Sequence, residues 1–162
     1  TGEVSVAMLA DVGCQYVIIG HSERRALYAE SNELVLAKTR RVLTAGLKAI
    51  VCVGETLSER QAGNAEQVVG QQLSLLLSEL STSEWQAVII AYEPVWAIGT
   101  GETATPEQAQ AVHQFIRSQL AARPISENLH GLGKYGIYHS RCSCPVGTWY
   151  RWFCDVAARQ GR

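Results

Sequence analysis

The sequence has no long apolar run and no strong excess of charge of either sign. No uninterrupted hydrophobic stretch approaches the roughly 18 residues of a membrane-spanning helix, so we expect no spanning segment. The 14 basic and 15 acidic side chains leave a formal net charge of −1, which gives no reason to expect a nucleic-acid or anionic membrane partner. No basic and apolar leader is recognisable, so we expect no signal peptide.

Cysteine is scarce, and its number is odd. The five cysteines are scattered, with three of them, Cys142, Cys144 and Cys154, near the end of the sequence. This pattern is typical of free thiols in a reducing compartment, so we expect a cytoplasmic protein. The 162 residues, 47% of them hydrophobic, are enough for a globular domain with its own core.

Three short apolar runs predict buried strands, over residues 16–19, 49–53 and 87–91. They are continuous rather than alternating, which is typical of a parallel sheet covered on both faces. Each run is followed by a short loop and a helix candidate, and this order predicts an α/β fold. A doubly wound sheet and a (β/α)₈ barrel both fit the pattern, although a complete barrel typically needs about 250 residues.

Capping signals mark the helix starts. Thr56 with Glu59 and Thr105 with Gln108 have the form of capping boxes, and Pro106 suits a first helical position. Three further helices are expected: one that begins with Ser22 as its cap, one that ends at Gly46, and one that covers residues 68–80.

Two polar side chains lie two residues after predicted strands, where α/β folds gather their functional groups. His21 follows the first strand and begins a helix, whose partial positive charge should lower the histidine pKa and keep the ring neutral. Glu93 follows the third strand beside apolar residues, which should make it a stronger base than a solvated carboxylate. A base and a hydrogen-bond donor that face one site suit proton abstraction next to a carbonyl.

The segment after Glu93 has the composition of a closing loop. An apolar tip runs from Val95 to Ile98, and Gly99 and Gly101 follow it. Such a tip could exclude water from a reactive intermediate, and the Gly99 N–H could reach an anionic substrate group. Each signal alone also fits a structural role, so these residues by themselves predict only an α/β enzyme with acid–base chemistry.

Longer strings carry a resemblance to a known family. "VIIGHSERR" (17–25) and "AYEPVWAIGTG" (91–101) resemble the two signature segments of triosephosphate isomerase. "VCVGET" (51–56) and "TGEVSVAMLADVGCQYV" (1–17) are similar to segments of the same family, and the resemblance runs to about residue 123. It implies a partial (β/α)₈ TIM barrel that covers about strands 4 to 6 with their helices, as a domain over residues 1–123.

The resemblance also implies a reaction and roles for individual residues. Dihydroxyacetone phosphate and glyceraldehyde 3-phosphate would be interconverted through an enediol(ate), a step of glycolysis and gluconeogenesis. Glu93 would be the proton acceptor and His21 the neutral electrophile, a use of histidine for which this enzyme is the standard example. Gly99 would bind the substrate, and Ser22, Glu23 and Ile98 would support the site.

Glu23 has a second interpretation, because an acid in the first turn of a helix is favourable for stability alone. The family members are usually homodimers without cofactor or metal, and residues 1–3 match a loop that reaches the neighbouring subunit. We therefore expect a homodimer that acts on a triose phosphate and needs neither cofactor nor metal.

Residues 124–162 lack the resemblance and any clear periodicity, so we expect a divergent, irregular tail there. A shifted reading frame and a genuinely divergent end both explain it. The glycine-rich phosphate-binding strings of the family are not found, nor is its lysine from the first strand. We therefore expect weak or no activity and low stability. The alternative is a non-catalytic fragment or binding protein, with a metal held by His139, Cys142, Cys144 and Cys154, although their spacing is not a standard zinc pattern.

Overall fold

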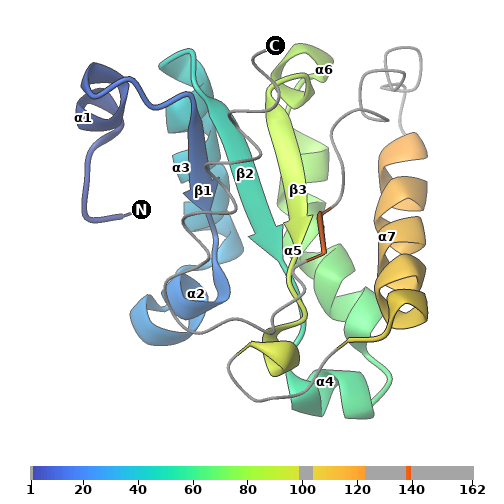
Figure 1. Cartoon of the computed structure of the whole chain (residues 1–162). Coiled ribbons are helices and arrows are strands. Elements are labelled where there is room, and N and C mark those ends of the chain that lie inside the picture. Colours follow the sequence, from blue (N-terminus) through green and yellow to red (C-terminus); the bar gives the residue numbers. More distant parts are fainter. Residues whose placement is uncertain (1, 99–103, 123–137, 140–162) are drawn as a thin grey trace.

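The computed structural model describes residues 2–98, 104–122 and 138–139. Its centre is a parallel sheet in the order β1-β2-β3-β4, with bounds Tyr16–Ile19, Lys48–Val53, Val88–Tyr92 and Tyr138–His139. The strands run in one direction, so the carboxyl ends of β1, β2 and β3 lie at the same edge of the sheet (Figure 1). The three predicted strands are confirmed, each within one residue at either end.

Helices connect the strands and cover one face of the sheet. Along the chain they are α1 (Val6–Asp11), α2 (Ser22–Tyr28), α3 (Asn32–Thr44), α4 (Leu57–Gln61), α5 (Ala65–Glu79), α6 (Thr82–Trp85), the 3₁₀ helix η1 (Val95–Ala97) and α7 (Pro106–Ala121). Helices α3 and α5 pack side by side behind the sheet, and α7 packs against α5 (Figure 1). This is an α/β fold of repeated strand–helix units, consistent with part of a barrel.

The main core lies between the sheet and these helices. Alternate strand residues such as Val17, Val51 and Ile90 face α3, α5 and α7 and are at most 6% exposed. The opposite face carries a smaller buried cluster that includes Ile50 and Ile89. Strand β1 differs from the prediction, because its residues alternate between half-buried and buried. Its half-buried residues, Tyr16 and Ile18, pack against the smaller cluster on the opposite face of the sheet.

The observed helix starts confirm some of the predicted caps and correct others. The capping boxes at Thr56 and Thr105 are both present, with Pro106 in the first turn of α7. One prediction was wrong: Ser22 is the first residue of α2, and His21 is its cap. Helix α5 also begins three residues before the predicted start at residue 68, after Asn64. Helices α1 and α6, with six and four residues, were not predicted.

After residue 122, the structure describes only β4. The sequence predicted no regular structure there, whereas this two-residue strand pairs in parallel with β3, with Ala91 opposite Tyr138. The rest of the expected tail lies outside the described residues. None of the helices in the described ranges has both the length and the apolar composition needed to cross a bilayer.

Candidate functional site

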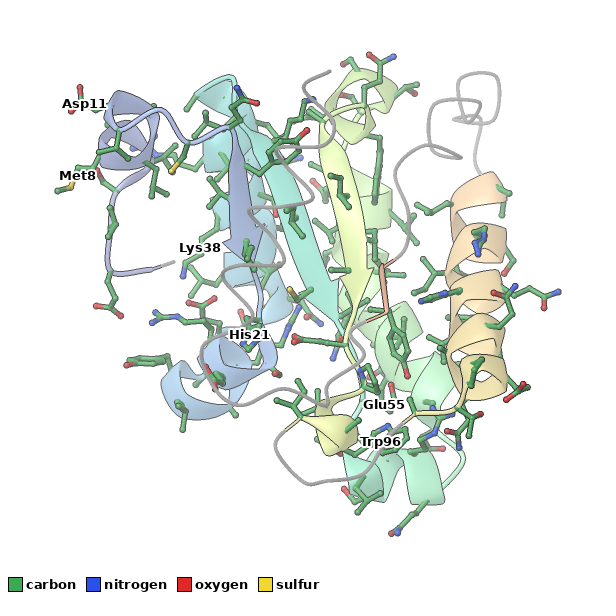
Figure 2. All side chains as sticks on the ribbon, viewed as in Figure 1. Met8, Asp11, His21, Lys38, Glu55 and Trp96 are labelled. Atoms are coloured by element: carbon green, nitrogen blue, oxygen red, sulfur yellow. The ribbon has the colours of Figure 1, made fainter. Side chains whose placement is uncertain are left out.

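The turn after β1 brings His21 to the edge of the sheet. Gly20 makes this turn with a φ of +70°, a conformation that suits glycine. A Cβ at this position would lie 3.1 Å from the Arg25 guanidinium and from Val35, so the turn also packs closely. His21 follows as the cap of α2, at the carboxyl ends of the strands (Figure 2).

The His21 ring is held by the helix that it caps. Its Nδ1 accepts a hydrogen bond from the Glu23 N–H at 3.3 Å. A nitrogen that accepts cannot carry the proton, so in the neutral ring the hydrogen lies on Nε2. Burial lowers the pKa of His21, although the charge of Glu23 opposes this. The predicted direction is therefore confirmed, but burial is the main cause rather than the helix terminus.

Glu93 faces this ring from the end of β3. Its Oε1 accepts a hydrogen bond from the Ser22 N–H at 2.8 Å, and its Oε2 lies 3.2 Å from His21 Nε2. Beyond this approach to His21, Oε2 has no hydrogen-bond partner among the described residues, and Glu93 is 4% exposed. Burial raises the pKa of Glu93 to about 8, against the opposing effects of the Ser22 hydrogen bond and the Arg25 charge. The direction of this pKa shift is the one expected from the sequence, whereas the role of Glu93 as a base stays a prediction.

Gly54 lets the ends of β2 and β3 approach each other, a role that the sequence analysis missed. A Cβ at this position would lie 1.8 Å from the Glu93 carbonyl oxygen, so only glycine fits without a shift of the backbone. The Gln72 side-chain amide holds both backbone groups of Gly54, accepting from its N–H at 2.9 Å and donating to its carbonyl at 3.0 Å. Helix α5 thereby fixes the backbone beside Glu93.

Glu55 is a second acid at this edge, and it was not predicted as a site residue. It is fully buried, and its Oε1 accepts hydrogen bonds from the Tyr92 hydroxyl, the Trp96 indole and Arg60, at 2.8–2.9 Å. Its carbonyl oxygen accepts from the Val95 N–H at 3.1 Å. Figure 2 shows Glu55 and Trp96 together beside α4. These bonds fix the start of the predicted closing loop as the 3₁₀ helix η1. The position of Glu55 two residues after the second predicted strand was the sequence signal that could have identified it as a site residue.

Comparison with known protein families matches a family model described as triosephosphate isomerase to residues 1–131. The chain belongs to the triosephosphate isomerase family. It is similar to triosephosphate isomerases of Alkalilimnicola ehrlichii (61% identical over 129 residues, 80% of this chain and 51% of that one) and Herminiimonas arsenicoxydans (58% over 123 residues, 76% and 50%). The relative from Hydrogenovibrio crunogenus is 59% identical over 121 residues, 75% of this chain and 48% of its own. The chain thus spans about half the length of these relatives.

The other residues that the isomerase resemblance singled out differ in where they lie. The Ser22 backbone N–H donates to Glu93, and the Glu23 backbone N–H donates to His21 Nδ1. The exposed Glu23 carboxylate lies 4.0 Å from the same nitrogen. Ile98 is half-buried and follows η1 directly. Gly99 lies outside the described residues, so its predicted contact with substrate stays a prediction.

Neither a metal cluster nor the described cavity coincides with His21 and Glu93. No group of His, Cys, Asp and Glu suited to a metal occurs within the part of the chain that the structure describes. The candidate ligands His139, Cys142, Cys144 and Cys154 fall where no side chain is described. A cavity of about 510 Å³ lies between α1, β1 and α3, and it has an apolar lining without His21 or Glu93.

Proposed function

We propose that this chain carries the base and the electrophile of a triosephosphate isomerase, which interconverts dihydroxyacetone phosphate and glyceraldehyde 3-phosphate. The observation that supports the proposal is the pair of His21 Nε2 and Glu93 Oε2, 3.2 Å apart, in a member of this family. One atom of the pair can donate a hydrogen and the other can accept one. A substrate bound against this pair would reach both groups at once.

Glu93 acts as the proton carrier in this proposal. Its Oε1 is fixed by the Ser22 N–H, which leaves Oε2 to take a proton from the carbon beside the substrate carbonyl. The C–H electrons then form the enediolate, and the same carboxyl returns a proton to the neighbouring carbon. A pKa of about 8 suits this exchange, because a base works best when its pKa lies near the working pH.

His21 acts on the substrate oxygen. In the neutral ring the Nε2–H donates to the carbonyl oxygen, where negative charge grows as the proton leaves carbon. Burial lowers the pKa of His21 and so favours this neutral form. The bond from the Glu23 N–H to Nδ1 keeps the donor nitrogen directed at the site.

The remaining parts of the proposal come from the family. Gly99 binds the phosphate through its backbone N–H when the loop after η1 closes. The whole protein is a cytoplasmic homodimer that uses neither cofactor nor metal and binds no nucleic acid. Residues 1–123 form a partial barrel domain, and residues 124–162 form a separate tail. Since the chain spans about half the length of its relatives, we expect its full turnover by itself to be weak or absent, whereas the proton exchange at carbon should remain detectable.

The test combines a full-turnover assay with a partial reaction. The purified chain is assayed for isomerase activity with a coupled dehydrogenase, and its exchange of substrate C1 hydrogen with solvent deuterium is followed by NMR. We expect exchange in the native chain, a loss of at least about 100-fold in Glu93→Gln, and no change in Glu66→Gln, which alters an exposed acid on α5. A folded chain that shows neither turnover nor exchange, or a Glu93→Gln variant that exchanges normally, contradicts the assignment.

A further inference from the structure

Arg25 joins three elements near the site through neutral acceptors. Its Nε donates to the Gly20 carbonyl at 2.8 Å, and its Nη1 donates to Asn32 Oδ1 at 2.8 Å. Its Nη2 makes a longer bond to the Cys52 carbonyl at 3.5 Å. Gly20 directly precedes His21, Asn32 begins α3, and Cys52 lies in β2. The planar fork of an arginine thus ties the His21 turn to the strand next to Glu93.

The charge of Arg25 is not neutralised by a carboxylate at contact distance. Arg24 forms ion pairs with Glu3 and Glu30, and Arg60 forms one with Glu55. Within the described part of the chain Arg25 forms none, although it is half-buried. A cation bound only to neutral oxygens keeps its electric field, whereas a contacting carboxylate would cancel most of it.

That field acts on Glu93. Burial lowers the pKa of the Arg25 guanidinium, and the charges of Cys52 and Glu93 oppose this effect. Conversely, burial raises the pKa of Glu93, and the Arg25 charge opposes that rise. The register supports the same relation, since Cys52 pairs with Ala91, two residues before Glu93.

We propose that Arg25 is a positioning residue of this site, which fixes the His21 turn against β2 and directs an uncancelled positive charge at Glu93. The charge stabilises the ionised carboxylate, the form that can take a proton from carbon. This role rests on the proposed function, whereas the three hydrogen bonds of the Arg25 side chain do not. Arg25 itself need not touch the substrate.

Other groups also act on Glu93, and the test has to separate them from Arg25. From the β1–α2 turn and α2 these are His21, whose Nε2 is 3.2 Å away, and Glu23, whose charge raises the pKa of Glu93. From β2 it is Cys52, whose thiol pKa burial and Glu93 both raise. Glu55 lies on the following turn and is already paired with Arg60. A comparison of variants that leave all four groups in place isolates the charge of Arg25.

The experiment follows the titration of Glu93 without relying on activity. The Ser22 N–H donates to Glu93 Oε1, so its amide chemical shift in ¹⁵N-labelled full chain reports the ionisation of that carboxyl. We expect Arg25→Gln to raise the midpoint by about one pH unit, at the low end of what a nearby opposite charge contributes. Arg41→Gln removes an equal charge from an exposed position on α3 and should leave the midpoint unchanged.

Asn32→Asp is a second variant that keeps the size of the side chain. It replaces a neutral acceptor of Arg25 by a carboxylate, which cancels the field while the arginine stays in place, and an acid suits the first turn of α3. We expect its midpoint to rise as well, so the proposal remains testable if Arg25→Gln does not fold. An unchanged midpoint in a folded Arg25→Gln or Asn32→Asp variant overturns the proposal. A raised midpoint in a chain without exchange activity supports it and counts only against the proposed function.

Discussion

Because the carboxyl of Glu93 is buried, we expect the free energy of unfolding to fall as the pH rises. The folded chain raises the pKa of Glu93 from its ordinary value of 4.5 to about 8. The folded state therefore holds this proton more tightly than the unfolded state does. The stabilisation is fully present below pH 4.5 and is lost as the pH rises through about 8. This difference between the folded and unfolded pKa values corresponds to about 5 kcal/mol in the free energy of unfolding. Glu93 is 4% exposed, so solvent screening reduces it little.

Urea unfolding followed by tryptophan fluorescence, at several pH values from 5 to 9, measures this effect. The Glu93→Gln side chain cannot ionise, so this variant should lack this part of the pH dependence. Its free energy of unfolding relative to that of the native chain should therefore rise by several kcal/mol from pH 5 to pH 9. The surface acids are the same in both proteins and largely cancel in the difference. Glu66→Gln serves as the matched control and should follow the native curve. Parallel curves for Glu93→Gln and the native chain would refute the assignment of a buried, proton-binding carboxyl.

Two further substitutions test the packing beside the site. Gly54→Ala places a Cβ 1.8 Å from the Glu93 carbonyl oxygen, so we expect a loss of at least about 3 kcal/mol in urea unfolding. In Gly46→Ala the Cβ meets nothing within 4 Å, and the cost should be about 1 kcal/mol from the φ of +75° alone; equal losses would contradict the close approach. Trp96→Phe removes the indole donor to Glu55 and should cost about 1–2 kcal/mol in the same measurement, and a cost of zero would show that this bond contributes nothing.

The strands and the two facing side chains were predictable because their signals are local. Continuous apolar runs mark buried strands, and His21 and Glu93 each lie within two residues of the end of such a run. Parallel strands bring their carboxyl ends to one edge, so two positions far apart in the chain become neighbours without knowledge of the register. The capping boxes at Thr56 and Thr105 are equally local, and both are present.

The missed features depend on the register between strands or on very short elements. The contact of Gly54 with Glu93 and the bond of Arg25 to Cys52 exist only because β2 and β3 pair as they do. No string in the sequence states that pairing. Helices α1 and α6 are too short to show a helical period. The cap of α2 was assigned to Ser22 because serine is a common cap, whereas an imidazole nitrogen takes that place.

His21, at the start of α2, has two separable roles: it caps the helix and it faces Glu93. As a cap, Nδ1 of His21 offers the Glu23 N–H only what an asparagine or aspartate oxygen would also offer. Helix formation alone therefore does not explain a histidine at this position. What the imidazole adds is a second nitrogen on the far side of a rigid ring, pointed away from the helix and towards Glu93. His21→Asn would keep the capping hydrogen bond and remove the nitrogen that faces Glu93. This substitution therefore measures the contribution of the cap separately from that of the site.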